Sequence, residues 1–209
     1  MRNLLLFCTI LFLLVACNQQ DESGNPSVSE SDDTDDIVSG GIEAEIKPFH
    51  LADATEDADL IAQVTILEKV DEVHAEPVPY TVFRAEVAES IEGEPSSETV
   101  TIKQLGDSEW PINNNAFFEP GEEYIFFLNE TSESNSDYWI IGEETGFFQV
   151  LDDDTVVKLV HSIPELKEAE SDNVNELNIS TEELKMATDE QVLDKQKFIN
   201  LLNHLEEDS

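Results

Sequence analysis

Apolar and polar residues alternate with a period of two through the middle of this 209-residue chain, and this pattern limits its fold most strongly. Successive side chains of a strand point to opposite faces, so the alternation is typical of strands with one buried face. It begins at about Ala52 and is clearest in residues 59–66, 83–87 and 99–103. We expect each of these runs to form a strand.

Further strand signals follow in the second half of the chain. Residues 124–128 are apolar on both faces, which favours a central or barrel-closing strand. Shorter strands are expected at 138–141, 146–151 and 155–160. Six or seven strands at this spacing predict a mainly β protein, a small antiparallel barrel or sandwich.

Helix signals appear after Pro164. Residues 188–191 fit a capping box, and Phe198, Leu201, Leu202 and Leu205 recur at helical spacing. We expect a C-terminal α-helical tail with its helix from about Asp189 to Glu206. Covering an open edge or end of the barrel is the favoured role of this helix, and binding a partner is the alternative.

The first seventeen residues have the anatomy of an export signal. Arg2 precedes an apolar run, Leu4 to Ala16, which is shorter than the ~20 residues that a bilayer span requires. Its end, Leu14-Val15-Ala16-Cys17, resembles the lipobox of bacterial lipoproteins. The resemblance implies that Cys17 carries lipid and becomes the first mature residue, so the chain would be anchored on the extracytoplasmic face of the cell membrane.

These signals divide the chain into four parts. We expect a signal peptide at 1–16, a lipidated cysteine with an acidic tether at 17–47, a β-barrel domain at 48–162, and a linker with the helical tail at 163–209. Residues 18–41 of the tether hold hardly any large apolar side chain to offset the entropy of ordering, and their like charges favour an extended chain.

The formal net charge of −38 restricts the partners of the chain. Nucleic acid is not expected as a partner, because its binding depends on Lys and Arg that neutralise phosphate. The acid excess fits an exported protein adapted to salt, and the alternative is a functional acidity that repels anionic wall polymers or binds a cationic partner. The two cysteines cannot build a disulfide framework or a four-cysteine metal site.

The strand block has a recurring order of hydrophobic and turn signatures. The segments that carry this order are 58–64, 83–93, 100–106, 120–128 and 142–148. Their order resembles secreted bacterial domains similar to the netrin-like and tissue-inhibitor-of-metalloproteinase modules. That resemblance implies an OB-like five-stranded barrel over residues 52–160. It transfers no functional residue, because Cys17 lies far before the first strand and the disulfide cysteines of the inhibitors are absent.

Two groups of residues are candidates for binding. Trp110, Phe117 and Phe118 lie in a long polar connection, where aromatic side chains either bind a ligand or close the barrel end. Asp152, Asp153 and Asp154 offer carboxylates to calcium, although an acidic turn needs no metal.

Known catalytic motifs are missing from the sequence, so we expect no enzyme and no cofactor. We expect a membrane-anchored binding or interaction module with an unidentified protein or cell-wall partner. The alternative is a calcium-responsive or cell-wall structural lipoprotein that uses its acidic loops.

Overall fold

The computed structural model describes residues 41–43, 45, 49–113, 115–132, 134–160, 162–172 and 191–207. All of them belong to one compact unit, Val38–Ser209. The predicted signal peptide, Cys17, the capping box at 188–191 except Gln191, and nearly all of the tether lie outside the described residues.

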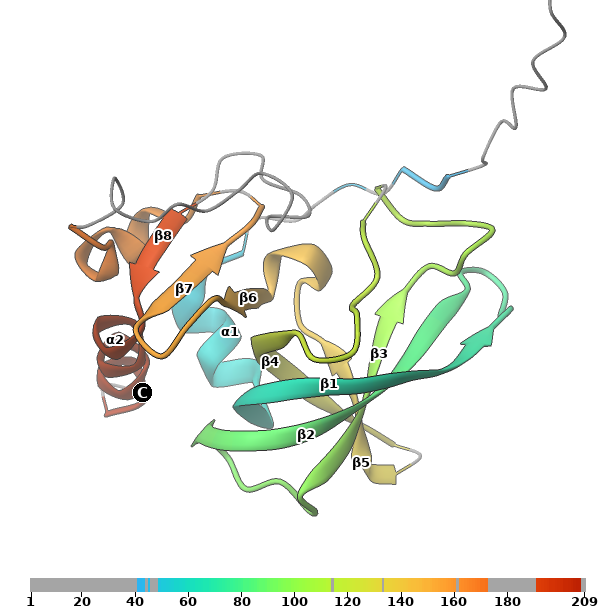
Figure 1. Ribbon diagram of the computed structural model, residues 1–209, viewed down its shortest axis with the longest axis horizontal. Helices are drawn as coiled ribbons and strands as arrows, with labels where there is room; N and C mark the ends of the chain where they lie inside the picture. The colour runs from blue at the N-terminus through green and yellow to red at the C-terminus, as the bar shows by residue number, and fades with distance from the viewer. Residues whose placement is uncertain are drawn as a thin grey trace, which may run out of the picture. The chain divides into compact units, whose positions relative to one another are not determined.

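Five strands close into a barrel (Figure 1). They are β1 (Leu60–Val73), β2 (Tyr80–Glu92), β3 (Thr99–Leu105), β4 (Glu123–Thr131) and β5 (Ser134–Ile140). Around the barrel the order is β1-β2-β3-β5-β4, and β4 returns to pair with β1. Within this ring β3 and β5 pair in parallel and the other neighbours are antiparallel. The predicted mainly β, OB-like barrel is therefore confirmed.

A second group of elements extends the sheet from β4 and covers one side of the barrel (Figure 1). Its strands are β6 (Phe147–Val150), β7 (Thr155–Lys158) and β8 (Gln191–Asp194). Its helices are α1 (Leu51–Asp57), α2 (Lys195–Glu207) and the short 3-10 helices η1 (Glu143–Thr145) and η2 (Pro164–Ala169). No helix among the described residues is long and apolar enough to span a bilayer.

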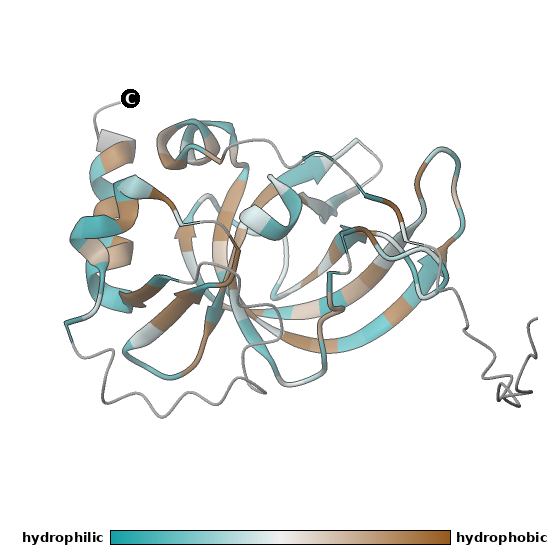
Figure 2. Ribbon diagram, turned by 90° about the horizontal axis from the view of Figure 1, so that it is seen from above, coloured by the Kyte–Doolittle hydropathy of each residue, from teal (hydrophilic) through white to brown (hydrophobic). Residues whose placement is uncertain are grey.

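Hydrophobic and hydrophilic residues alternate along the strands (Figure 2). The buried hydrophobic residues form two apolar cores. In β4, Tyr124, Phe126 and Leu128 point into the barrel, while Ile125 and Phe127 point to the outer core beneath the helices. The strand is apolar on both faces because both faces are buried, and its pairing with β1 closes the barrel. The prediction of a barrel-closing strand at 124–128 is confirmed.

The C-terminal segment differs from the predicted tail. Helix α2 begins at Lys195, not at Asp189, because residues 191–194 form strand β8 on the free edge of β7. The side-chain amide of Gln191 accepts from Ile163 N at 2.6 Å and donates to Ile163 O at 3.1 Å, which joins η2 to this strand. Residues 163–169 and 191–205 are therefore part of the folded body and supply side chains to the outer core.

The N-terminal boundary of the period-two pattern also differs. Residues Leu51–Asp57 form α1, and the first strand begins at Leu60 instead of near Ala52. Leu51 and Ala54, which lie three residues apart, are the side chains that α1 buries against the outer core. This spacing belongs to a helix face, and the helix is too short to give a clear periodic signal.

Candidate ligand-binding hollow

Two loops meet at the end of the barrel where β1 turns into β2. Gly106 N, at the end of β3, donates to Pro79 O at 2.8 Å, and Thr81 Oγ1 donates to Gly106 O at 2.8 Å. Gly106 has φ +97°, and a Cβ there would lie 3.0 Å from Ile112 N. Glycine is therefore required where β3 gives way to the loop.

Asp107 is the buried centre of this loop. Its Oδ1 accepts from Glu109 N at 3.0 Å and from Trp110 N at 2.7 Å, which forms a tight turn. Its Oδ2 lies 2.7 Å from His74 Nδ1, and the Asp107 side chain is 0% exposed whereas that of His74 is 64% exposed. With Nδ1–H donating to a carboxylate, a neutral His74 ring keeps a lone pair on Nε2.

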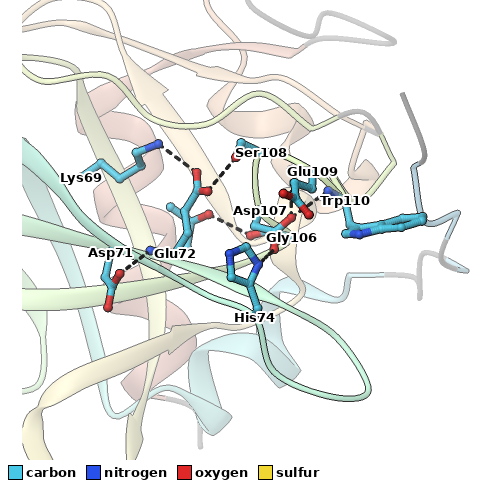
Figure 3. A network of polar contacts seen from close by, with 10 residues as sticks. Lys69, Asp71, Glu72, His74, Gly106, Asp107, Ser108, Glu109 and Trp110 are labelled. Carbon is cyan, nitrogen blue, oxygen red and sulfur yellow. Dashed lines mark hydrogen bonds and ion pairs between the residues drawn. The ribbon is translucent and has the colours of Figure 1, made fainter. Parts of the chain in front are cut away.

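A second acidic residue holds the same loop against the hairpin (Figure 3). Lys69 Nζ lies 2.9 Å from Glu72 Oε1, and Ser108 Oγ donates to Glu72 Oε2 at 2.7 Å. The hydrogen bonds from Lys69 and then Ser108 hold the pKa of Glu72 below its ordinary value. Glu72 therefore stays ionised and links β1 to the loop that follows β3.

Ile42, near the end of the predicted tether, contacts the loop after β3 and completes the hollow. Ile42 N donates to Pro111 O at 3.0 Å, and Asn113 N donates to Ile42 O at 2.9 Å. Ile42 thereby forms a parallel bridge with Ile112. Asn113 Nδ2 in turn donates to Glu144 Oε1 at 2.6 Å, which connects the loop to η1. The loop is thus supported from the tether side and from the barrel side.

These loops form the walls of a hollow of about 300 Å³ that is open to solvent. It is lined by Ile42, His74, Ala75, Pro77, Pro79, Asp107, Glu109 and Trp110. Trp110 is 49% exposed, and Figure 3 shows its indole projecting away from the polar network. An apolar surface with a few oriented polar groups is the usual composition of a ligand site.

The polar groups do not form a hydrolytic triad. His74 and Asp107 have the geometry of a base and the residue that orients it. The nearby hydroxyl of Ser108, however, donates to Glu72 and not to His74. The arrangement therefore places an oriented imidazole beside an aromatic surface, which suits binding.

The three aromatic residues singled out in the sequence have separate positions. Trp110 lines the hollow, whereas Phe118 is 5% exposed inside the barrel core and Phe117 packs against that core. Beside Phe117 and Phe118 there is a cavity of about 10 Å³, which is room for about one water. Phe118 therefore belongs to the barrel core, and of the three aromatic residues Trp110 is the one that lines the hollow. Ligand binding by these residues stays a prediction.

Asp152, Asp153 and Asp154 form the exposed turn between β6 and β7. Asp152 Oδ1 accepts from Asp154 N at 2.9 Å, an ordinary use of aspartate in a turn. Over the described ranges, no group of three or more His, Cys, Asp or Glu is placed to hold a metal ion. Calcium binding at this turn stays a prediction.

His74 and Asp107 were not predicted as members of the site. The two residues are 33 positions apart, and a single histidine in a polar loop gives no signal of its partner. The turn signal at Gly106-Asp107 was available, because aspartate after glycine favours such turns. No family model matches the chain, and a search of curated proteins found no match.

Removing the carboxylate of Asp107 should loosen this loop. We expect Asp107→Ala to lower the free energy of unfolding by about 1–3 kcal/mol, because three donors lose their acceptor and two of them are main-chain groups. Asp107→Asn keeps one acceptor oxygen and should cost less. Chemical denaturation of the full-length variants measures both effects. An alanine variant within about 0.5 kcal/mol of wild type would show that the carboxylate does not organise the loop.

Proposed function

We propose that this chain is a lipid-anchored binding module on the extracytoplasmic face of the bacterial membrane, with its ligand site in the hollow beside Trp110. The observation that carries the proposal is the hollow itself. It places a half-exposed indole and an oriented imidazole on the walls of a cavity of about 300 Å³. A large aromatic ring left in solvent beside a cavity is typical of a recognition surface.

The topology supports this location. OB-type barrels commonly bind ligands with the loop between their first two strands, which here supplies His74, Ala75, Pro77 and Pro79. Many OB domains bind nucleic acids, but the charge of −38 disfavours that class of ligand. A protein, a cell-wall component or a small molecule remains as the ligand.

The anchor half of the proposal rests on the Leu14-Val15-Ala16-Cys17 pattern. Metabolic labelling with a fatty-acid analogue should mark the wild-type protein and leave Cys17→Ala unlabelled. The variant should also leave the membrane fraction, because the apolar leader alone is shorter than a bilayer span. Equal labelling of both proteins would reject the anchor.

The binding half can be tested with tryptophan fluorescence, because the chain has two tryptophans. Trp139 packs edge-on against Tyr80 with ring centroids 5.1 Å apart, and Trp139→Phe keeps an aromatic ring there. In the full-length Trp139→Phe protein Trp110 is the reporter. We expect members of a mixed library of cationic, neutral and anionic fragments to change its emission.

The matched control is Trp110→Phe, which retains as the reporter Trp139, a residue that is not part of the lining of the hollow. Fragments that act in the hollow should leave the emission of this control unchanged. The hollow is not the ligand site if no fragment of any charge class changes the emission of Trp110. The same conclusion follows if the same fragments change the emission of Trp110 and Trp139 equally.

A further inference from the structure

We propose that the hollow selects an organic cation, meaning a primary ammonium or guanidinium group on an aliphatic stem. The inference rests on the proposed function, since it names the ligand class of the same site. The charge of the lining, its apolar surface and the hydrogen bonds of its acidic groups support this ligand class.

The lining holds two carboxylates and the ring of His74, which is charged only when it is protonated. Asp107 and Glu109 contribute carboxylates, and none of the eight lining residues is Lys or Arg. Glu76, which is exposed, adds a third carboxylate in the loop that carries His74. An anion would meet like charge at every approach to the hollow, whereas a cation is attracted both by these groups and by the acidic protein as a whole.

The two lining carboxylates have different roles. Asp107 is fully buried, and its oxygens already accept from His74, Glu109 N and Trp110 N. Glu109 is exposed, and within the described part of the chain no hydrogen bond or ion pair occupies its carboxylate. Glu109 is therefore the group available for a direct ion pair with a ligand, while Asp107 adds a fixed negative charge behind it.

The apolar part of the lining suits a stem. Ile42, Pro77 and Pro79 supply aliphatic surface, and Trp110 supplies an exposed indole face. Indole is the aromatic side chain that attracts cations most strongly, and long cationic side chains lay their methylenes on apolar surface while the charge stays in water. A ligand can therefore lay its aliphatic stem on Trp110 while its charged head pairs with the carboxylate of Glu109.

Two sources share this chemistry: a lysine or arginine side chain of a partner protein, and a free aliphatic amine. Three probes distinguish these two sources and measure the contribution of the ammonium charge to binding. They are acetyl-Leu-Lys-Leu-amide, its norleucine analogue acetyl-Leu-Nle-Leu-amide, which keeps the four-carbon stem without the ammonium, and cadaverine. Each is titrated into the full-length Trp139→Phe protein in a non-ionic detergent while the emission of Trp110 is followed.

We expect the lysine peptide to bind about tenfold more tightly than the norleucine peptide, from the sum of an exposed cation–π contact and an ion pair. Glu109→Gln should weaken the lysine peptide about threefold and leave the norleucine peptide unchanged. The matched control is Glu94→Gln, an exposed glutamate at the other end of β2, which should have no effect. Added NaCl should weaken the lysine peptide selectively.

Tight binding of cadaverine alongside or in place of the lysine peptide supports the cation class and assigns the free amine as a source. Equal affinity for the lysine and norleucine peptides would overturn the inference while leaving the hollow as a binding site. No response of Trp110 to either cation would overturn it as well. The proposed function fails on a different result, which is that no fragment of any charge class changes the emission of Trp110.

Discussion

Phe118→Ala is expected to lower the free energy of unfolding by about 3–5 kcal/mol, the range for large aromatic residues lost from a core. The ring is 5% exposed and lies at the centre of an aromatic cluster inside the barrel. Its centroid is 4.9 Å from that of Tyr124 and 5.1–5.2 Å from those of Phe83, Phe126 and Phe147. Edge-to-face pairs of this kind add to the apolar area that the ring buries. Denaturant unfolding of the full-length protein measures the loss.

Trp110→Ala provides the matched control for this prediction. Both residues are aromatic and belong to the connection between β3 and β4, but Trp110 is 49% exposed. We expect its replacement to change the free energy of unfolding by less than about 1 kcal/mol. Similar losses for the two variants would contradict the separation of Phe118 as a core residue from Trp110 as a binding residue.

The stability of the wild-type protein is expected to rise with pH above neutrality, and Lys158→Met should remove most of this rise. In wild type, the free energy of unfolding should rise by about 3 kcal/mol between about pH 7 and about pH 9.5. The variant should show little change over that interval. Denaturant titrations at closely spaced pH values measure both profiles.

The cause of this rise is the burial of the ammonium group. Lys158 is fully buried in β7, donates to Val160 O at 2.7 Å and lies over the rings of Phe49 and Phe148. Burial lowers its pKa to about 7, and the negative charge of Glu144 offsets part of that decrease. Above pH 7 the folded amine is neutral while the unfolded one binds a proton, so stability rises until the ordinary pKa of lysine is reached.

Glu143 provides an independent control with the opposite slope. Burial raises its pKa to about 7, although the hydrogen bond from Leu105 N opposes this shift. Between about pH 4.5 and about pH 7 the folded carboxyl keeps a proton that the unfolded one loses, so its contribution to stability falls as pH rises. Glu143→Gln should remove this decrease between about pH 4.5 and about pH 7 and leave the rise above pH 7 unchanged. A variant in which both pH ranges change, or neither does, would contradict the assignment of the decrease to Glu143.

The strands were predictable because each has a local signal. Alternation at 59–66, 83–87 and 99–103 reflects one face in the barrel core, and the doubly apolar run at 124–128 reflects the burial of β4 between two cores. The resemblance to OB-type modules supplied the barrel class. The parallel pairing of β3 with β5 was not available from local pattern, because it joins strands separated by a long connection.

The boundary between β8 and α2 could not be settled from sequence for a physical reason. Four residues, 191–194, give too short a pattern to distinguish a strand from the first turn of a helix. Their strand conformation is fixed by the edge of β7, to which they pair at every position from Thr155 to Lys158. Pairing with β7 therefore holds residues 191–194 as a strand, and the predicted helix begins only after them, at Lys195.

The candidate site was only partly predictable. Trp110 stood out as an aromatic residue in a polar connection, which is a local property. The contact between His74 and Asp107, and the return of Ile42 beside Ile112, depend on how the barrel brings distant loops together. The difference between Trp110 and Phe118 likewise depends on which side of the loop faces the core.

The most direct test of the central claim is to map the bound lysine peptide by ¹H–¹⁵N chemical-shift perturbation in the full-length protein. The account predicts perturbations at residues 74–79 and 106–113, with Ile42 among them, and their loss in Trp110→Ala. Perturbations centred on β6, β7, β8 and α2 would contradict it. So would a spectrum that the peptide leaves unchanged.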